Sequence, residues 1–207
     1  MTAKVHPQAS SAPVSTTMGA TTTEKTTFTL WMKSLVFHGR GLAVFNQDGK
    51  VAYRMDNYGE KCSREVLLMD LAGQVLFTIR RKKQGLRCPC WEGYEGMEKS
   101  LSTKQPSFWV KEHRSRHFFQ TKNLICEVVN DSLANIENYE IVKSTSSKSG
   151  CKITNAVGKT IAKVKPKQAC GGVSLGRDVL SLEVDPEADA SLVMALVAVH
   201  GLVNGQI

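Results

Sequence analysis

The 207-residue sequence lacks both a secretory leader and an apolar run long enough to span a membrane. Its first residues do not show the basic segment, apolar segment and small-residue cleavage site of a signal peptide. The longest apolar stretch, near the C-terminus, is shorter and more interrupted than the roughly 20 residues that cross a bilayer. We therefore expect an intracellular protein, cytoplasmic, membrane-peripheral or nuclear, whose six cysteines stay reduced.

Local catalytic motifs are also missing. The sequence has no Gly-x-Ser-x-Gly elbow, no His-Glu-x-x-His pair, no Walker loop and no dinucleotide fingerprint. Glu92, Glu95 and Glu98 recur at every third position, but the glycines among them indicate a solvated loop. We predict a non-enzymatic protein without a cofactor, although catalytic residues that only folding brings together leave no local pattern.

Cysteine pairs with metal-ligand spacing are scarce. Structural zinc sites use two closely spaced ligand pairs, whereas this sequence has one, Cys88 and Cys90. The remaining cysteines stand alone: Cys62, Cys126, Cys151 and Cys170. Lone cysteines behave as small core residues, so we predict no metal site. Lipid attachment to one of these thiols stays open, because palmitoylation has no dependable sequence pattern.

A histidine pair offers the other spacing that could suggest a metal. His113 and His117 are four positions apart, as in helical zinc sites, but the surrounding residues show no helical apolar stripe. Arg114 and Arg116 lie between them and would repel a divalent cation. We therefore predict that this pair holds no metal.

Acidic residues are too few to balance the basic ones. The chain has 27 Lys and Arg against 19 Asp and Glu, a formal charge of +8, and most of the excess falls in residues 80–122, called here the basic band. The sequence shows no ribonucleoprotein, zinc-finger or basic-zipper signature, so we expect no sequence-specific nucleic-acid contact. Anionic lipid is the better candidate partner, since each Lys or Arg near an acidic leaflet contributes about 1 kcal/mol. Alternatively, these side chains point in several directions and only keep the protein soluble.

The candidate lipid contacts within the basic band are Arg80, Arg81, Lys82, Lys83, Arg87, Lys111, Arg114 and Arg116.

Aromatic residues, leucine and isoleucine are absent from residues 1–27, which hold eleven Ser or Thr instead. Such a segment buries too little apolar surface to offset the entropy of ordering it. We predict a disordered tail over 1–27 and one folded domain over 28–207, for which the 42% hydrophobic content suffices.

Three glycine-centred segments repeat one pattern, typical of antiparallel hairpins. After Gly49, Gly73 and Gly158, large or β-branched residues fall at alternate positions, which places each set on one face of a strand. The glycines supply the positive φ that a tight turn requires. Apolar segments broken by turn residues continue to residue 184, which predicts a mainly β protein.

The C-terminal segment changes to a helical pattern over about residues 186–203. Asp185 can cap this helix and Pro186 suits its first position. The helix is apolar on every side, and such a helix is either enclosed by protein or in lipid. A sheet closed on itself would enclose it and remove its own edges. The predicted core residues of the helix are Leu192, Val193, Leu196, Val197 and Val199.

Several motifs in this order resemble the plant LURP-one-related family, whose fold belongs with the tubby C-terminal domain and the phospholipid scramblases. Residues 70–76 read DLAGQVL and lead into RRKK at 80–83, WEGY occupies 91–94, LGRDVL occupies 175–180, and DPEAD at 185–189 precedes the apolar helix. The resemblance covers about residues 28–203. It implies a closed antiparallel β-barrel of about twelve strands that encloses the hydrophobic C-terminal helix.

The resemblance also suggests functions that the residues alone do not. Tubby-like relatives hold phosphoinositide on a basic face of the barrel and act in the nucleus after release, which suggests binding of anionic phospholipid in plant signalling or defence. Two alternatives stay open. One is a scaffold without lipid binding that recruits an unknown protein partner through the barrel and the loop at residues 144–150; the other is a lipid scramblase, whose helix would enter the membrane. We expect a monomer.

Overall fold

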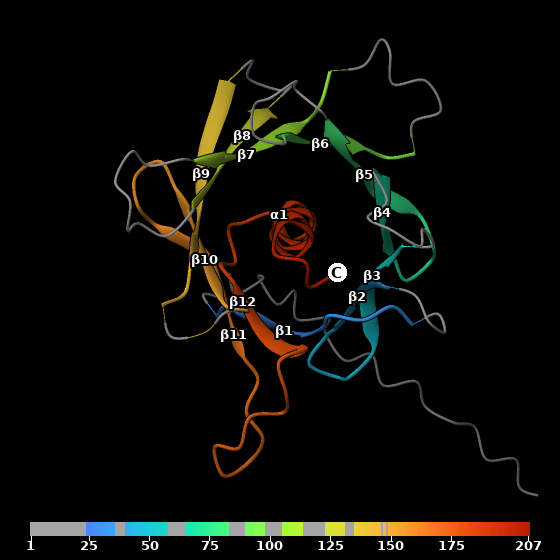
Figure 1. Ribbon diagram of the computed structural model, residues 1–207, viewed down its shortest axis with the longest axis vertical. Helices are drawn as coiled ribbons and strands as arrows, with labels where there is room; N and C mark the ends of the chain where they lie inside the picture. The colour runs from blue at the N-terminus through green and yellow to red at the C-terminus, as the bar shows by residue number, and fades with distance from the viewer. Residues whose placement is uncertain are drawn as a thin grey trace, which may run out of the picture.

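A computed structural model describes residues 24–35, 40–57, 65–82, 90–97, 105–113, 123–130, 135–145, 147 and 149–207. These residues form twelve strands and one helix (Figure 1). The strands are β1 (Thr26–Trp31), β2 (Arg40–Phe45), β3 (Val51–Asn57), β4 (Glu65–Asp70), β5 (Val75–Lys82), β6 (Cys90–Glu95), β7 (Phe108–His113), β8 (Asn123–Asn130), β9 (Asn135–Lys143), β10 (Cys151–Asn155), β11 (Thr160–Pro166) and β12 (Val179–Val184); the helix is α1 (Ala190–Val203).

The strands form a closed antiparallel barrel in the simplest order. Each strand pairs with the next along the chain, and β1 pairs with β12 to close the sheet. Successive strands therefore run in opposite directions, so the connections fall in turn at the two ends of the barrel. The predicted fold, a mainly β barrel of about twelve strands around one helix, is confirmed.

The glycine-centred hairpins form as the alternation predicts. Gly49, Gly73 and Gly158 have φ of 73°, 80° and 82°, which only glycine adopts without strain. In the strands that follow, Met55 and Ile79 are fully buried and face the barrel interior. The alternate side chains of each strand thus supply the inner wall.

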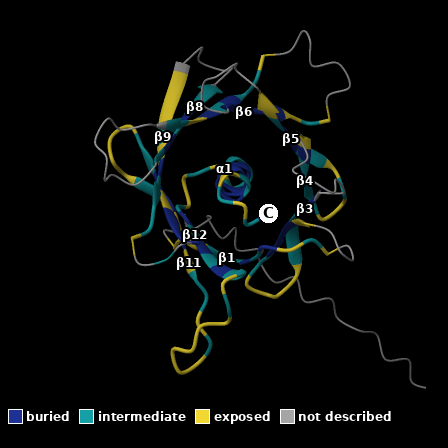
Figure 2. Ribbon diagram, in the orientation of Figure 1, coloured by how far each residue is buried: buried dark blue, intermediate teal, exposed yellow. Residues whose placement is uncertain are grey.

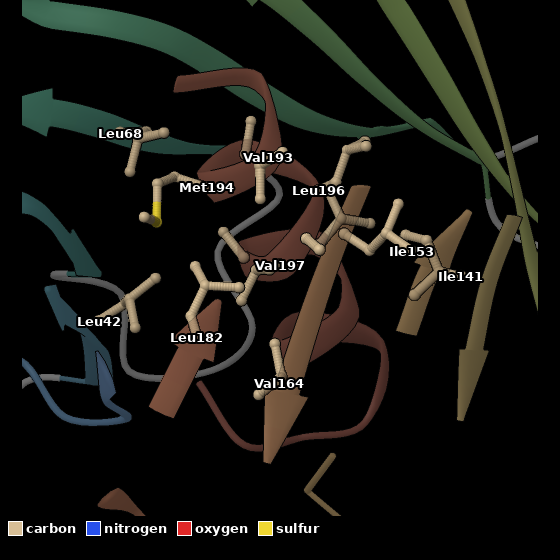
Figure 3. Packing of buried hydrophobic residues seen from close by; sticks show 14 of the residues in the cluster. Leu42, Leu68, Ile141, Ile153, Val164, Leu182, Val193, Met194, Leu196 and Val197 are labelled. Atoms are coloured by element: carbon tan, nitrogen blue, oxygen red, sulfur yellow. The ribbon is translucent and has the colours of Figure 1, made fainter. Parts of the chain in front are cut away.

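Helix α1 runs along the inside of the barrel (Figures 1 and 2). Its residues from Val193 to Gly201 are buried, while Leu192 is half-buried. In Figure 3, Val193, Met194, Leu196 and Val197 lie among side chains of the surrounding strands, including Leu42, Leu68, Ile141, Ile153, Val164 and Leu182. Enclosure explains why the helix needs no polar face. No helix in the described part of the chain is long and apolar enough to cross a membrane.

The helix begins four residues later than predicted, and Asp189 rather than Asp185 is its N-cap. The Asp189 carboxylate accepts bonds from the Ser191 and Leu192 amides at 2.8 and 3.4 Å. Asp185 is held in the sheet instead, because its amide donates to the Ile161 carbonyl at 2.8 Å. The predicted start at residue 186 was therefore wrong: the residues after Asp185 form a turn that leads the chain from the barrel wall to its axis.

The barrel also begins slightly earlier than the predicted boundary. Thr26 and Thr27 belong to β1 and pair with Val184 and Glu183 of β12. β-Branched threonine suits a strand, so these two residues form part of the sheet. Residues 1–23 of the predicted tail lie outside the described residues.

Candidate functional site

The two ends of the barrel carry opposite charge. We call the end where α1 begins the acidic end and the end where α1 stops the basic end. Over the described residues, the acidic end carries more carboxylates than cations, namely Glu24, Asp48, Asp70, Glu95, Glu137, Asp185, Glu187 and Asp189 against Lys25, Lys50, Arg54 and Lys159. Carboxylates near a helix N-terminus and cations near a C-terminus both interact favourably with the helix dipole. The charge distribution therefore follows the direction of the enclosed helix.

A cavity of about 800 Å³ opens at the acidic end. Its acidic groups are largely engaged within the protein. Lys159 contacts Asp185 at 3.2 Å and Glu187 at 2.5 Å, and the Tyr139 hydroxyl donates to Glu137. This arrangement ties the β10–β11 turn to the segment that leads into α1.

The basic end carries four cations for which the described residues supply no carboxylate partner. Arg40, Arg81, Lys143 and Arg177 make no ion pair with any described residue. Arg40 begins β2, Arg81 and Lys143 lie at or next to the ends of β5 and β9, and Arg177 shortly precedes β12. The alternation of strand directions brings all four positions to this end of the barrel.

Two of these cations, Lys143 and Arg177, line a cavity of about 770 Å³. The other lining residues are mostly small and polar: Met32, Ser144, Thr145, Ser147, Ser149, Asp178, Asn204 and Gln206. The register places Lys143 opposite buried Cys151, on the face of β9 that points inward. The cavity therefore combines two cations with hydroxyl and amide groups, which is the set of groups that binds phosphate and other anions.

Among the lining residues that the structure describes, Asp178 is the one carboxylate, and Lys33 neutralises it. Lys33 Nζ lies 2.7 Å from the carboxylate, and Trp31 Nε1 donates to it at 3.4 Å. The bond to Lys33 is the main cause that holds the pKa of Asp178 below its usual value. The cavity thus retains the charge of Lys143 and Arg177.

The loop between β9 and β10 forms one wall of this cavity. Ser144 N donates to the Gly150 carbonyl at 2.9 Å, and Gly150 N donates to the Ser147 carbonyl at 3.4 Å. Ser149 and Gly150 are buried. These bonds join the two ends of the loop, where β9 stops and β10 starts.

The floor of the basic end is the last turn of α1. Asn204, which lines the cavity, caps the helix by donating to the His200 carbonyl from its backbone and side chain, at 3.1 and 2.7 Å. His200 is buried, and desolvation, followed by the charge of Lys143, lowers its pKa to about 4. The imidazole is therefore neutral near pH 7.

Most of the described members of the basic band are neutralised on the outer wall of the barrel. Arg80 pairs with Glu65, Lys82 with Glu92 at 2.7 Å, and Lys111 with Glu127 at 3.3 Å. Arg81 is the exception, because it lies on the opposite face of β5 at the rim. The other predicted lipid contacts, Lys83, Arg87, Arg114 and Arg116, lie outside the described residues.

Glu92 shows how firmly one of these pairs is held. Its side chain is buried and accepts from Tyr94 Oη at 3.0 Å as well as from Lys82. The bond from Lys82 to Glu92 is the main cause that raises the pKa of Lys82. Burial, followed by the bond from the Tyr94 hydroxyl to Glu92, raises the pKa of Tyr94 to about 12. Glu92 therefore lies in a built ion pair and not in the solvated loop expected from the sequence.

The cysteines are placed as single residues. Cys90, Cys126 and Cys151 are buried, and burial is the main cause that raises the pKa of each thiol. Cys170 is exposed, while Cys62, Cys88 and His117 lie outside the described residues. Among the residues that the structure places, no group of three or more His, Cys, Asp or Glu is arranged to hold a metal.

The sequence analysis missed the cations that line the cavity. Lys143 and Arg177 are 34 positions apart and lie outside the basic band. A signal was nevertheless present: Lys143 ends a strand and Arg177 lies in a strand connection, and both positions fall at the same end of an up-and-down sheet. Counting strands would have brought them to one end of the barrel.

Comparisons with known proteins agree with this architecture. The LURP-one-related family model matches residues 26–201. Two similar proteins from Arabidopsis thaliana are LURP-one-related 11, 39% identical over 97% of this chain and 88% of its own length, and LURP-one-related 4, 41% identical over 98% and 87%. An X-ray structure of an Arabidopsis thaliana protein superposes with a TM-score of 0.59 at 14% identity, over 88% of this chain and 93% of that one, which shows the shared fold. The chain belongs to the LURP-one-related family.

Proposed function

We propose that this LURP-one-related protein is a non-enzymatic, peripheral membrane protein that binds anionic phospholipid with the basic end of its barrel. The observation that carries the proposal is the cavity lined by Lys143 and Arg177 with serine, threonine, Asn204 and Gln206. Gln206 Oε1 is buried and has no hydrogen-bond partner among the described residues. A headgroup with phosphate oxygens and hydroxyls offers acceptors to the cations and a donor to this amide.

The magnitude of the charge term indicates weak, reversible association. Arg40, Arg81, Lys143 and Arg177, which form no ion pair within the described part of the chain, would contribute about 1 kcal/mol each near an acidic leaflet. About 4 kcal/mol corresponds to a millimolar dissociation constant, so contacts within the cavity must add to the attraction for tighter binding. Such a protein would exchange between membrane and cytosol, which suits a signalling role.

The enclosed helix argues against the scramblase alternative. Residues Val193 to Val199 are buried against the inner wall of the barrel. Transfer of α1 into lipid would open the sheet and expose that wall to water. The protein would then lose the free energy that the burial of this apolar surface contributes. Lipid contact at the basic end needs no such rearrangement.

Co-sedimentation with lipid vesicles tests the proposal. Vesicles of phosphatidylcholine alone and vesicles that also contain phosphatidylserine or phosphoinositide are incubated with the full chain at low and high salt. The proposal predicts retention by the anionic vesicles that falls as salt rises, because screening weakens the interaction of exposed charges. Equal retention by neutral and anionic vesicles, or none by either, would overturn it.

A further inference from the structure

The connection from β11 to β12, residues 167–178, is an ordered finger beside the basic end. It projects outward from the barrel wall (the orange loop at the bottom of Figure 1). Lys167 N donates to the Val179 carbonyl and Leu175 N to the Lys167 carbonyl, at 3.1 and 3.0 Å. Nearer the tip, Ala169 N donates to the Val173 carbonyl at 2.8 Å. The finger therefore has its own backbone hydrogen bonds and is built before it meets any partner.

The finger presents apolar side chains to solvent. Val173 is 68% exposed and Leu175 is 48% exposed, at alternate positions along an extended segment. Ser174 between them forms an isolated bridge with Gln168. Side chains two positions apart in an extended segment point to the same side. Val173 and Leu175 therefore form one exposed apolar edge of the finger.

Cations flank this apolar edge. Arg177 follows Leu175 by two positions and lines the cavity at the basic end. Lys167 lies at the other side of the finger base, directly after β11, and its ammonium group donates to the Thr29 hydroxyl of β1. The finger thus joins an apolar edge to the cavity that we assign to a headgroup. An apolar edge next to cations suits the boundary between headgroups and acyl chains.

Exposed apolar residues occur at both ends of the barrel, so they do not by themselves show which end would contact a membrane. Val157, in the β10–β11 turn, is 86% exposed at the acidic end, and Leu71, Met97 and Ile136 are also exposed there. An anionic membrane would repel the carboxylates around those residues. Charge therefore distinguishes the two ends, and Val157 is a natural control.

We propose that the β11–β12 finger inserts Val173 and Leu175 into the interfacial region of an anionic bilayer while Arg177 contacts the headgroups. This inference rests on the proposed function, because it needs the basic end to face the membrane. It adds the element that enters the lipid and the depth to which it enters. The finger, and not α1, is then the part of the protein that meets acyl chains.

Depth-dependent fluorescence quenching tests the insertion. Val173→Trp and Val157→Trp are prepared in the full chain, where both variants keep the three native tryptophans as a common background. Each is mixed with anionic vesicles whose lipids carry bromine at a shallow acyl position. We expect bromolipid to quench the added fluorescence of Val173→Trp and to leave that of Val157→Trp unchanged.

Affinity for the same vesicles supplies a second readout. Val173→Ser with Leu175→Ser should weaken binding about tenfold or more, because the apolar contribution is lost, whereas Val157→Ser should leave binding unchanged. If anionic vesicles bind the wild type but quench neither tryptophan, or if the double variant binds as the wild type does, the insertion is wrong while the proposed function stands. If the wild type does not bind anionic vesicles, both proposals fail.

Discussion

The ring of Phe108 lies directly over Gly93, its cross-strand partner in the barrel wall. A Cβ built on Gly93 would fall closer than 3.0 Å to ring carbons of Phe108, a distance that real Cβ atoms do not show. Phe108 is fully buried and also packs against Phe77, with ring centroids 5.7 Å apart. The glycine of the WEGY motif is therefore required by packing, since only a residue without a side chain leaves room for this ring.

Gly93→Ala tests this packing. We expect it to lower the free energy of unfolding by about 1–3 kcal/mol through overpacking, measured by urea denaturation. Phe108→Leu provides the matched background, because a smaller side chain makes room for the new methyl group. In that background Gly93→Ala should cost much less, or even stabilise by reducing the entropy of the unfolded chain. Additive effects of the two substitutions would contradict the proposed steric relationship.

Leu196→Ala tests the enclosure of α1. Leu196 is fully buried inside the barrel, so we expect a loss of about 2–5 kcal/mol in the free energy of unfolding. Val203→Ala on the same helix is the control; Val203 is 36% exposed, and its replacement should cost about 0.5 kcal/mol or less. Similar small effects at both positions would mean that the helix does not pack against the inner wall.

His200 makes the stability of the barrel depend on pH. Its pKa in the folded protein is about 4, below the 6.5 of an ordinary histidine, so the unfolded chain takes up a proton that the folded protein resists. Stability from this source is complete above pH 6.5 and is lost as the pH falls toward 4, by about 3 kcal/mol in all. His200→Leu should flatten the wild-type curve by this amount, in urea unfolding from pH 7.5 to 4.5. Parallel curves for the two proteins would exclude the histidine as the cause.

Asp189 and Asp185 are predicted to have separable roles. Asp189→Ala should remove the N-cap, lower stability by about 1 kcal/mol and speed hydrogen exchange at the Ser191 and Leu192 amides. Asp185→Ala, which breaks the contact with Lys159, should leave these two amides protected. If Asp185→Ala exposed the amides and Asp189→Ala did not, the helix would begin where the sequence analysis placed it.

The sequence was sufficient to predict the barrel and its enclosed helix. The alternation of apolar and polar residues after Gly49, Gly73 and Gly158 indicated which side chains of each strand share a face. A helix that is apolar on every side must be enclosed by protein if it is not in lipid. The strand number came from resemblance. The helix start could not be placed, because the DPEAD segment suits both a turn and a cap. In the folded protein the bond from Asp185 to the Ile161 carbonyl on β11 and the bonds from the Glu187 and Ala188 amides to Asp185 favour the turn.

The candidate site was harder to predict, because ion pairs depend on strand register. Glu65 lies opposite Arg80, and Lys82 and Lys111 each reach a carboxylate on an adjacent strand. No local pattern in the sequence shows these partners, so the basic band appeared to hold more free charge than its described part does. Lys143 and Arg177, far apart in the sequence, are brought to one cavity by the barrel topology.

The proposed function assigns anionic lipid to the basic end of the barrel and not to its outer wall. The most direct measurement compares the affinity of two double variants for phosphatidylserine vesicles at equal salt. Lys143→Gln with Arg177→Gln removes two charges from the cavity; Lys152→Gln with Lys163→Gln removes two from exposed, cross-strand positions on the wall. We predict at least about tenfold weaker binding for the first variant, since about 1 kcal/mol per cation is lost, and near wild-type binding for the second. Equal weakening of both would mean that net charge alone attracts the protein, and would contradict a specific site at the basic end.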